Sequence, residues 1–317
     1  MRARAATSLA RRGAGALVLT LALAACSSDD GPGAGSDEAT LSVVASTNVW
    51  GDVVRQVGGD LVEVTSVVDD PSVDPHSFEA NARVELAMSR ADLVIVNGGG
   101  YDDFASQLLE ALDQAPPVVV AVDSHAAEDT HAEDTHAEDG HAHGEGNEHV
   151  WYDPPTVEAV ALDVADELAA LAPEHAAQLR ANADAFVGRL AELEQRAARL
   201  AEEHGGAEVL ATEPVPLFLV EAAGLVDRTP PPFSAAVEEE TDVPPAAMSE
   251  MLDLVSSPQV AFLVYNEQTT GPQTDQVLEA AQAAGLPVVD VTETLPEGED
   301  YVSWMAGNLD AFAQALA

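Results

Sequence analysis

The sequence predicts an α/β fold of two lobes, each with a mainly parallel sheet flanked by helices, joined by one long helix. Three observations lead to this prediction. Short runs rich in β-branched residues alternate with amphipathic segments in residues 40–172, and the alternation returns in residues 205–317. Between these halves, a single helical pattern occupies residues 173–204. Alternating strand and helix patterns are typical of parallel sheets with helices on their faces.

The N-terminal lobe is expected to hold four short strands with helices between them. Valine-rich runs predict strands at 41–46, 62–68, 93–97 and 118–122. Apolar spacing near 3.6 residues predicts helices at 49–57, 83–89 and 104–112, and another from about 155 to 171.

A long helix follows and connects the two halves. Pro173 ends the preceding helix and suits the first turn of the next one. At 1.5 Å per residue, a helix from 174 to 203 is roughly 45 Å long, so we expect a rigid connection. The second half predicts strands at 208–211, 260–265 and 287–291, and helices at 246–256, 274–284 and 301–316.

The N-terminus has the features of a lipoprotein signal peptide. Four arginines precede an apolar stretch at 14–25, which is too short to cross a bilayer comfortably. The stretch ends in Leu23-Ala24-Ala25-Cys26, and Cys26 is the only cysteine in the chain. We expect residues 1–25 to be removed, Cys26 to carry lipid, and residues 26–39 to form a flexible tether. The alternative is an ordinary cleaved signal with an incidental cysteine.

The charge balance excludes one large class of function. The chain has 56 acidic and 12 basic residues, a formal net charge of −44. Nucleic-acid binding depends on a basic surface, so it is not expected here. An acidic surface is compatible with gathering cations, although it is more often simply a solvated surface.

Residues 124–148 form a low-complexity insert in the N-terminal lobe. The unit Ala-Glu-Asp-Thr-His occurs twice and a variant of it follows, so the segment offers almost nothing to bury and is expected to be disordered. Its histidines could form weak auxiliary metal sites that raise the local metal concentration. These histidines are His125, His131, His136, His141 and His143. The alternative is an accidental low-complexity expansion.

Four residues of metal-binding type lie at or just beyond the ends of predicted strands, where open α/β sheets bind ligands. These are His76, His149, Glu213 and Asp290, two from each lobe. Two imidazoles and two carboxylates suit Zn²⁺ or Mn²⁺ rather than Cu(I), which prefers sulfur. A single histidine or carboxylate at the end of a strand is more often a solvated polar residue or a helix cap than a metal ligand. The metal-site prediction therefore depends on the four residues occurring together.

The chain resembles the metal-binding receptors of zinc and manganese ABC importers, the ZnuA-like group. The pattern Asp-Pro-His-x-Phe-Glu stands at 74–79 and His-x-Trp-x-Asp-Pro stands at 149–154. The histidine-rich insert directly precedes the second of these motifs, and the tail contains Val289-Asp290, Asp300-Tyr301 and Trp304-Met305. The resemblance extends from the cysteine of the signal peptide to the C-terminus.

The resemblance implies an exported, lipid-anchored, monomeric receptor that passes metal to an importer permease and its ATPase. It implies His76, His149, Glu213 and Asp290 as metal ligands at the lobe interface, with Glu79 and Trp151 orienting or walling the site. Many zinc-type members have a histidine at the position of Glu213, whereas manganese-type members use glutamate. Glu213 therefore favours manganese, while the histidine-rich insert favours zinc. We favour zinc as the transported ion. Glu267, which also follows a predicted strand, is expected to be a second-layer or structural residue.

Two other classes of function remain as alternatives. A metallohydrolase is disfavoured because the sequence has neither an H-E-x-x-H motif nor a G-x-S-x-G motif, so we do not expect an enzyme. A metal store or an adhesin with the same fold is the other alternative.

Overall fold

The structure is a computed structural model that describes residues 40–70, 73, 78–129 and 147–317. Several predicted features lie outside these described residues. They are the signal peptide, Cys26, the tether, His76, His131, His136, His141 and His143. No helix in the described part of the chain is long and apolar enough to cross a membrane.

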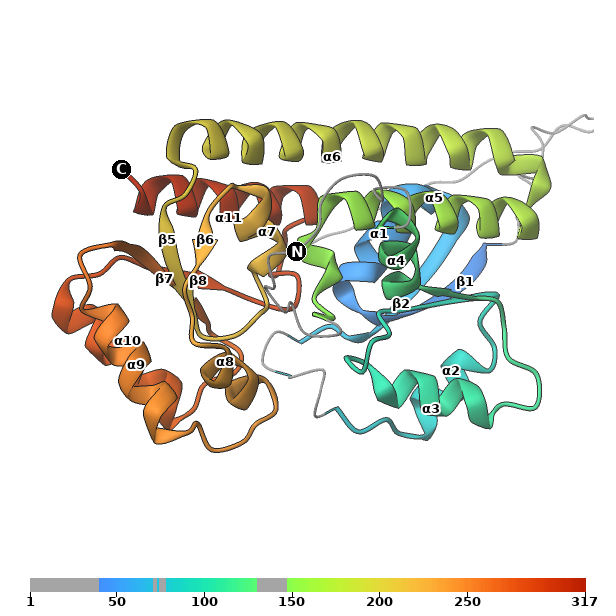
Figure 1. Ribbon diagram of the computed structural model, residues 1–317. Coiled ribbons are helices and arrows are strands. Elements are labelled where there is room, and N and C mark those ends of the chain that lie inside the picture. The colour runs from blue at the N-terminus through green and yellow to red at the C-terminus, as the bar shows by residue number, and fades with distance from the viewer. Residues whose placement is uncertain (1–39, 71–72, 74–77, 130–146) are drawn as a thin grey trace, which may run out of the picture. The chain divides into compact units, whose positions relative to one another are not determined.

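Each lobe contains a four-stranded parallel sheet, and the two sheets have the same strand order (Figure 1). In the N-terminal lobe the order is β2-β1-β3-β4, and in the C-terminal lobe it is β6-β5-β7-β8. The first sheet consists of β1 (Leu41–Thr47), β2 (Val62–Val68), β3 (Leu93–Val96) and β4 (Val118–Val120). The second consists of β5 (Glu208–Ala211), β6 (Val226–Asp227), β7 (Val260–Asn266) and β8 (Val288–Val291).

Helices cover both faces of each sheet. The N-terminal lobe has α1 (Asn48–Gly58), α2 (Ala82–Met88), α3 (Asp103–Ala111), α4 (Ala121–Asp129) and α5 (Pro154–Leu171). The C-terminal lobe has α7 (Leu217–Ala222), α8 (Pro231–Glu238), α9 (Pro245–Val255), α10 (Pro272–Ala284) and α11 (Tyr301–Ala315). The predicted two-lobe α/β fold is therefore confirmed.

The long helix α6 (Ala176–His204) runs along both lobes (Figure 1). A 3₁₀ turn at Pro173–His175 precedes it, as the proline predicts. Its buried residues recur every three or four positions, which is the spacing of one helical face. They are Leu179, Ala183, Phe186, Leu190, Leu193, Ala197 and Leu200. The face packs on α1 and α5 of the first lobe and on α7 and α11 of the second, so α6 belongs to both lobes.

One hydrophobic core is shared by the two lobes. It runs from Val43 and Trp50 through Phe186 of α6 to Phe262 and Phe312. Two smaller cores lie on the opposite faces of the sheets, one around Val94 and Phe104 and one around Phe233 and Leu263. A continuous core of this kind resists separation of the lobes, because parting them would expose apolar surface to water.

Hydrogen bonds join the lobes beside this core. The Asn48 side chain donates to the Leu295 carbonyl (2.8 Å) and accepts from the Leu295 N–H (2.9 Å). The Tyr301 hydroxyl donates to the Trp151 carbonyl and the Tyr152 hydroxyl to the Thr292 carbonyl, both at 2.7 Å. Burial raises the pKa of both tyrosines, which therefore remain protonated donors at neutral pH.

These contacts predict that the metal binding implied by the resemblance does not produce a wide hinge closure. Helix α6 has no interior proline, and the shared core and hydrogen bonds hold the lobes together. Small-angle scattering of protein lacking residues 1–39 and 130–146 should give nearly equal radii of gyration with and without zinc. A change of several per cent, on the order of that seen when a receptor closes about a hinge, would contradict this prediction.

The structure differs from the sequence predictions in two segments. The strand expected at 118–122 ends at Val120. Helix α4 follows at Ala121–Asp129, and it includes the first residues of the insert that was expected to be disordered from residue 124. The second difference is at 217–238, where α7, β6 and α8 were not predicted. Prolines at 214, 216 and 230–232 interrupt the apolar spacing there, and β6 has only two residues, too few for a periodic pattern.

Gly188 offers a test of the packing of α6. A Cβ added at Gly188 meets nothing within 4 Å, and the residue is exposed inside the helix. Gly188→Ala should therefore raise the free energy of unfolding by about 1 kcal/mol, because glycine loses more backbone entropy in a helix. Gly58→Ala is the matched control in α1, since its Cβ would lie 2.4 Å from Val62 Cγ2.

We expect Gly58→Ala to lower the free energy of unfolding by roughly 1–3 kcal/mol, the usual cost of overpacking. Chemical denaturation of both variants gives the comparison. Equal effects from the two substitutions would show that packing does not distinguish the two sites.

Candidate metal centre

The site residues lie where the strand order of each sheet reverses. The chain proceeds from the central strand to one side and then to the other, so β1 and β3 are neighbours in one sheet and β5 and β7 in the other. The crevice beyond the carboxyl ends of such strands is the usual ligand position in open α/β sheets. Asn97 follows β3, Glu213 lies just beyond β5, and Asn266 ends β7.

Two glutamates share one amide group at the carboxyl edge of the second sheet. Asn266 Nδ2 donates to Glu213 Oε2 (2.6 Å) and to Glu293 Oε1 (2.7 Å). Glu213 is 3% exposed and Glu293 is 2% exposed. Two buried carboxylates held this close repel each other unless a proton or a cation lies between them. The pair is therefore a suitable place for a divalent cation.

The backbone around Glu293 is fixed by Gln268. Gln268 Oε1 accepts the N–H groups of Glu293 (2.5 Å) and Thr294 (3.0 Å), and Gln268 Nε2 donates to the Thr294 hydroxyl (2.9 Å). Thr269 adds a hydroxyl donor to Glu293 Oε1 at 3.2 Å. Because the side chain of Gln268 holds two consecutive amides, Glu293 has little freedom to move away from Glu213.

Tyr101 of the N-terminal lobe reaches the same carboxylate. Its hydroxyl donates to Glu293 Oε2 at 3.1 Å. Tyr101 follows a turn in which Gly98 and Gly99 have φ of 79° and 70°, a region that favours glycine. Asp102 closes the turn by accepting the N–H groups of Asn97 (2.6 Å) and Gly98 (2.8 Å). Burial raises the pKa of Asp102, and these hydrogen bonds oppose that rise.

His149 lies fully buried on the N-terminal side of the site. Its Nδ1 is 2.9 Å from Asn147 Oδ1, and that oxygen also accepts the His149 backbone N–H at 3.1 Å. Asn147 Nδ2 donates to the Pro214 carbonyl (3.1 Å), next to Glu213. The His149 ring also packs against Tyr101, with centroids 5.7 Å apart. Asn147 thus connects His149 to Pro214, the residue after Glu213, and Tyr101 contacts both the His149 ring and Glu293.

The structure places three of the four predicted ligands. His149 and Glu213 lie in the buried region just described, while His76 lies outside the described residues. Asp290 differs from the prediction because it is exposed. Its neighbours Val289 and Val291 point into the core, so strand alternation turns Asp290 to the other face. Glu293, two residues beyond the end of β8, takes the buried position instead.

The predicted supporting residues have different environments. Trp151 is buried, with its ring 5.1 Å from that of His149 and 4.5 Å from that of Tyr101, so it packs against both side chains. Glu79 and Glu267 are exposed. Alternation beyond β7 explains Glu267, since Asn266 and Gln268 on either side of it point toward Glu293.

His125 is placed in helix α4 rather than in a disordered loop. Its Nδ1 lies 2.6 Å from the Thr156 hydroxyl and 3.4 Å from Asp153 Oδ2, and its ring packs on Phe218. Thr156 and Asp153 are also joined at the start of α5, where Asp153 caps the helix. These contacts indicate a packing role for His125, which separates it from the other histidines of the insert.

Sequence reasoning missed a further carboxylate beside His149. The ligand atoms of Glu148, His149 and Glu238 all lie within 4.8 Å of one another. Glu238 ends α8, and its Oε1 is 3.6 Å from His149 Nε2. Glu238 could not be singled out from the sequence, because it begins a run of three glutamates that is typical of a solvated surface.

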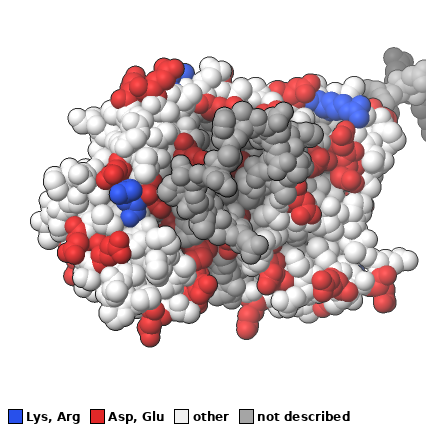
Figure 2. Space-filling model, in the orientation of Figure 1, with Lys and Arg blue, Asp and Glu red and all other residues white. Residues whose placement is uncertain are grey.

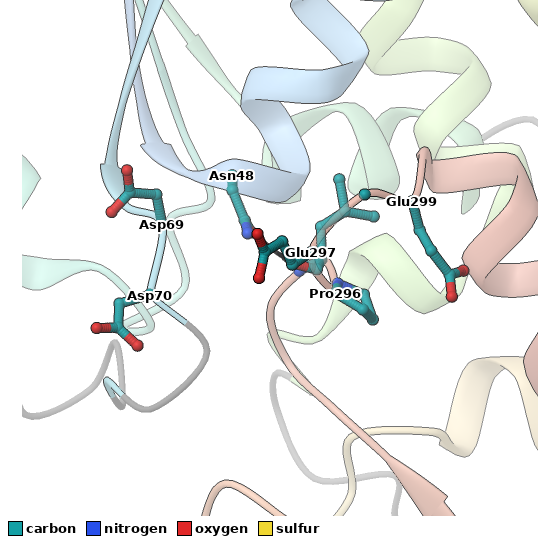
Figure 3. Close-up of a pocket in the computed structure, with 8 residues that line it drawn as sticks. Asn48, Asp69, Asp70, Pro296, Glu297 and Glu299 are labelled. Atoms are coloured by element: carbon teal, nitrogen blue, oxygen red, sulfur yellow. Dashed lines mark hydrogen bonds between the residues drawn. The ribbon is translucent and has the colours of Figure 1, made fainter.

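An open acidic cavity of about 430 Å³ lies elsewhere, between the end of β2 and the loop before α11 (Figure 3). Asp69 and Asp70 line one side, and Glu297 and Glu299 belong to the other. None of its described lining residues is a histidine. More widely, acidic side chains are scattered over the face shown in Figure 2, and basic ones are few there. This surface favours the approach of cations without defining a site.

Comparisons with known proteins give a consistent picture. The manganese-binding lipoprotein MntA of Halalkalibacterium halodurans is 28% identical over 181 residues, which cover 56% of this chain and 55% of MntA. The manganese ABC transporter substrate-binding lipoprotein PsaA of Streptococcus pneumoniae is 22% identical, over 95% of this chain and 96% of PsaA. The zinc-binding lipoprotein AdcA of Streptococcus pneumoniae is 22% identical, over 94% of this chain and 59% of AdcA. The chain thus spans little more than half the length of MntA and AdcA.

Solved structures share the fold. The periplasmic zinc-binding protein TroA of Treponema pallidum has a TM-score of 0.71 at 19% identity, covering 88% of this chain and 99% of TroA. Zn(II)-bound AdcA of Streptococcus pneumoniae has a TM-score of 0.65 at 20% identity, covering 87% of this chain and 58% of AdcA. The family described as zinc-uptake complex component A, periplasmic, matches residues 43–315. Since that match extends over most of the sequence, this chain belongs to the ZnuA family.

Proposed function

We propose that this protein is an extracytoplasmic receptor that captures a divalent transition metal, with zinc favoured, and delivers it to an ABC-type importer. The observation that carries the proposal is the buried pair Glu213 and Glu293, linked through Tyr101 and Asn147 to buried His149. A water-poor site with nitrogen and oxygen donors from both lobes is suited to holding a metal ion. The role is binding and transfer, without a catalytic step.

The proposed ligands are His76, His149, Glu213 and Glu293. Glu293 replaces Asp290 because it is buried and shares the Asn266 amide with Glu213. His76 remains in the set because its motif at 74–79 follows β2 in the sequence, where ligands of open α/β sheets are expected. His149 would bind through Nε2, with its Nδ1 oriented by Asn147, the usual arrangement for a metal-bound histidine.

Zinc is favoured over manganese by the composition of the insert. Four histidines between residues 131 and 143 provide borderline nitrogen donors, which suit zinc better than the harder manganese ion. Manganese is the second candidate, and Glu213 with Glu293 favours it because two of the four proposed ligands are carboxylates. The curated relatives include both manganese-binding and zinc-binding lipoproteins.

Delivery requires an anchor and a partner. Lipid on Cys26 would hold the mature monomer at the outer face of the cytoplasmic membrane, and residues 26–39 would give it reach. The partner would be an importer permease with its ATPase. PsaA is named as the substrate-binding lipoprotein of such a transporter.

Growth and uptake measurements test this role directly. A strain without this protein should take up less ⁶⁵Zn under chelation, and the intact gene should restore uptake while His149→Ala should not. Normal uptake in the deletion strain, together with a lower total content of bound zinc at the cell surface, would favour a metal store instead.

Removing the insert should separate tight binding from weak binding. Deletion of residues 130–146 removes no residue of α4 or of the described segment that begins at Asn147, so the tight site should keep its affinity within about threefold, while the weak auxiliary sites disappear. Equilibrium titration with competing zinc chelators resolves the two classes of site. Loss of tight binding on deletion would mean that the insert itself supplies ligands.

A further inference from the structure

Glu238 lies at the C-terminal end of α8, where the helix dipole disfavours a negatively charged side chain. It is the last residue of α8, and the C-terminal end of a helix carries partial negative charge. The helix is held in place by Phe233 and Ala236, which are buried in the core of the second lobe. The side chain of Glu238 is 16% exposed and is directed at His149. A cation beside this carboxylate would offset the repulsion from the helix end.

The hydrogen bonds of His149 indicate which of its two ring nitrogen atoms carries the proton. The other ring nitrogen has a lone pair and can bind a metal ion. Asn147 Oδ1 accepts the backbone N–H of His149, which identifies that atom as oxygen rather than nitrogen. The same oxygen lies 2.9 Å from Nδ1, so Nδ1 carries the proton in the neutral ring. Nε2 then presents its lone pair, and Glu238 Oε1 lies 3.6 Å from it.

This separation fits two ligands of one metal ion. With Zn–N and Zn–O bonds of about 2.0–2.2 Å, two ligands at a near-tetrahedral angle lie roughly 3.3–3.6 Å apart. The side chain of Glu148 belongs to the same group, with its ligand atom within 4.8 Å of both others. The backbone of Glu148 is fixed because its carbonyl accepts Asn97 Nδ2 at 2.8 Å.

We propose that Glu238 is a direct ligand of the ion bound by His149 Nε2. This inference rests on the proposed metal-binding function and adds a carboxylate from α8 to the proposed ligand His149. The bound ion would tie α8 to the segment that carries His149, joining the two lobes at a further point. An extra oxygen ligand also accommodates a coordination number above four, which hard ions such as Mn²⁺ require more than Zn²⁺ does.

Glu238→Gln tests the proposal because it keeps the shape of the side chain and removes its charge. We expect zinc affinity to fall by at least about tenfold, and manganese affinity to fall further. Glu239→Gln is the matched control, since Glu239 is the exposed neighbour and loses the same charge. Affinities come from chelator competition, and circular dichroism shows that each variant is folded. Glu238→Asp, which keeps the charge on a shorter side chain, should retain more affinity than Glu238→Gln.

Cobalt provides an independent measurement. The visible absorption of bound Co²⁺ depends on its ligands and geometry, so Glu238→Gln should change the spectrum and Glu239→Gln should not. Unchanged affinity and an unchanged spectrum in Glu238→Gln would overturn the proposal, because they would show that Glu238 does not bind the ion. Wild-type protein that binds neither zinc, manganese nor cobalt tightly would overturn the proposed function itself, so the two failures are distinguishable.

Discussion

Glu293→Gln should weaken zinc binding by at least about 100-fold, because losing a direct ligand costs more than the 10–100-fold typical of outer-layer partners. The substitution keeps an oxygen that can accept Asn266 Nδ2, so the fold around β8 should survive while the charge is lost. Glu213→Gln should have an effect of similar size for the same reason. Competition with zinc chelators at neutral pH measures both affinities.

Asp290→Asn is the matched control for these variants. It removes one carboxylate charge from β8, three residues before Glu293, but at an exposed position, so zinc affinity should stay within about twofold of wild type. The reverse result, a large loss in Asp290→Asn with little loss in Glu293→Gln, would restore Asp290 as the ligand and contradict the site described above.

Acid should release the metal steeply. A metal ion requires neutral imidazoles and ionised carboxylates, and a free imidazole titrates near pH ~6.5. With His76 and His149 both bound, two protons compete with the ion as the pH falls. Affinity should therefore decrease by up to about two decades per pH unit at pH values well below the pKa of both histidines.

The measurement is a chelator competition series from pH 7.5 to pH 5, corrected for protonation of the chelator. Circular dichroism at each pH separates release of metal from unfolding. Affinity that stays constant from pH 7 to pH 5 would show that histidines do not bind the ion. In His149→Ala the remaining affinity should fall by only about one decade per pH unit, since one imidazole is left.

The architecture could be predicted from the sequence because it depends on periodic patterns. The four buried residues of β3 form a continuous apolar run, as parallel strands do, and the buried face of α6 recurs at helical spacing over its full length. The two lobes and the helix that joins them follow from such patterns, without knowledge of any contact between distant residues.

The site was harder to predict because it depends on single positions. His149 and Glu213 were predicted from their place after strands, and they are buried, but Asp290 and Glu293 are three residues apart, and only burial distinguishes them. Strand alternation around Asp290 contained that information, since a residue between two buried valines faces the other side of the sheet. Glu238 left no comparable signal, because α8 lies in a proline-rich stretch without a regular apolar pattern.

Contacts between segments far apart in the sequence could not be predicted at all. The hydrogen bond from Tyr101 to Glu293 spans 192 residues, and the one from Asn147 to Pro214 spans 67. Each depends on how the lobes pack on α6, which no local pattern specifies. These contacts nevertheless define the geometry of the proposed site.

The most direct test of the central claim is anomalous diffraction at the zinc edge from crystals of the zinc-loaded protein. The site described above predicts one strong peak, bonded to His149 Nε2, Glu213 and Glu293, with Asp290 too far away to bind. A strong peak at Asp290 or in the acidic cavity beside Asp69, with none at His149, would contradict it.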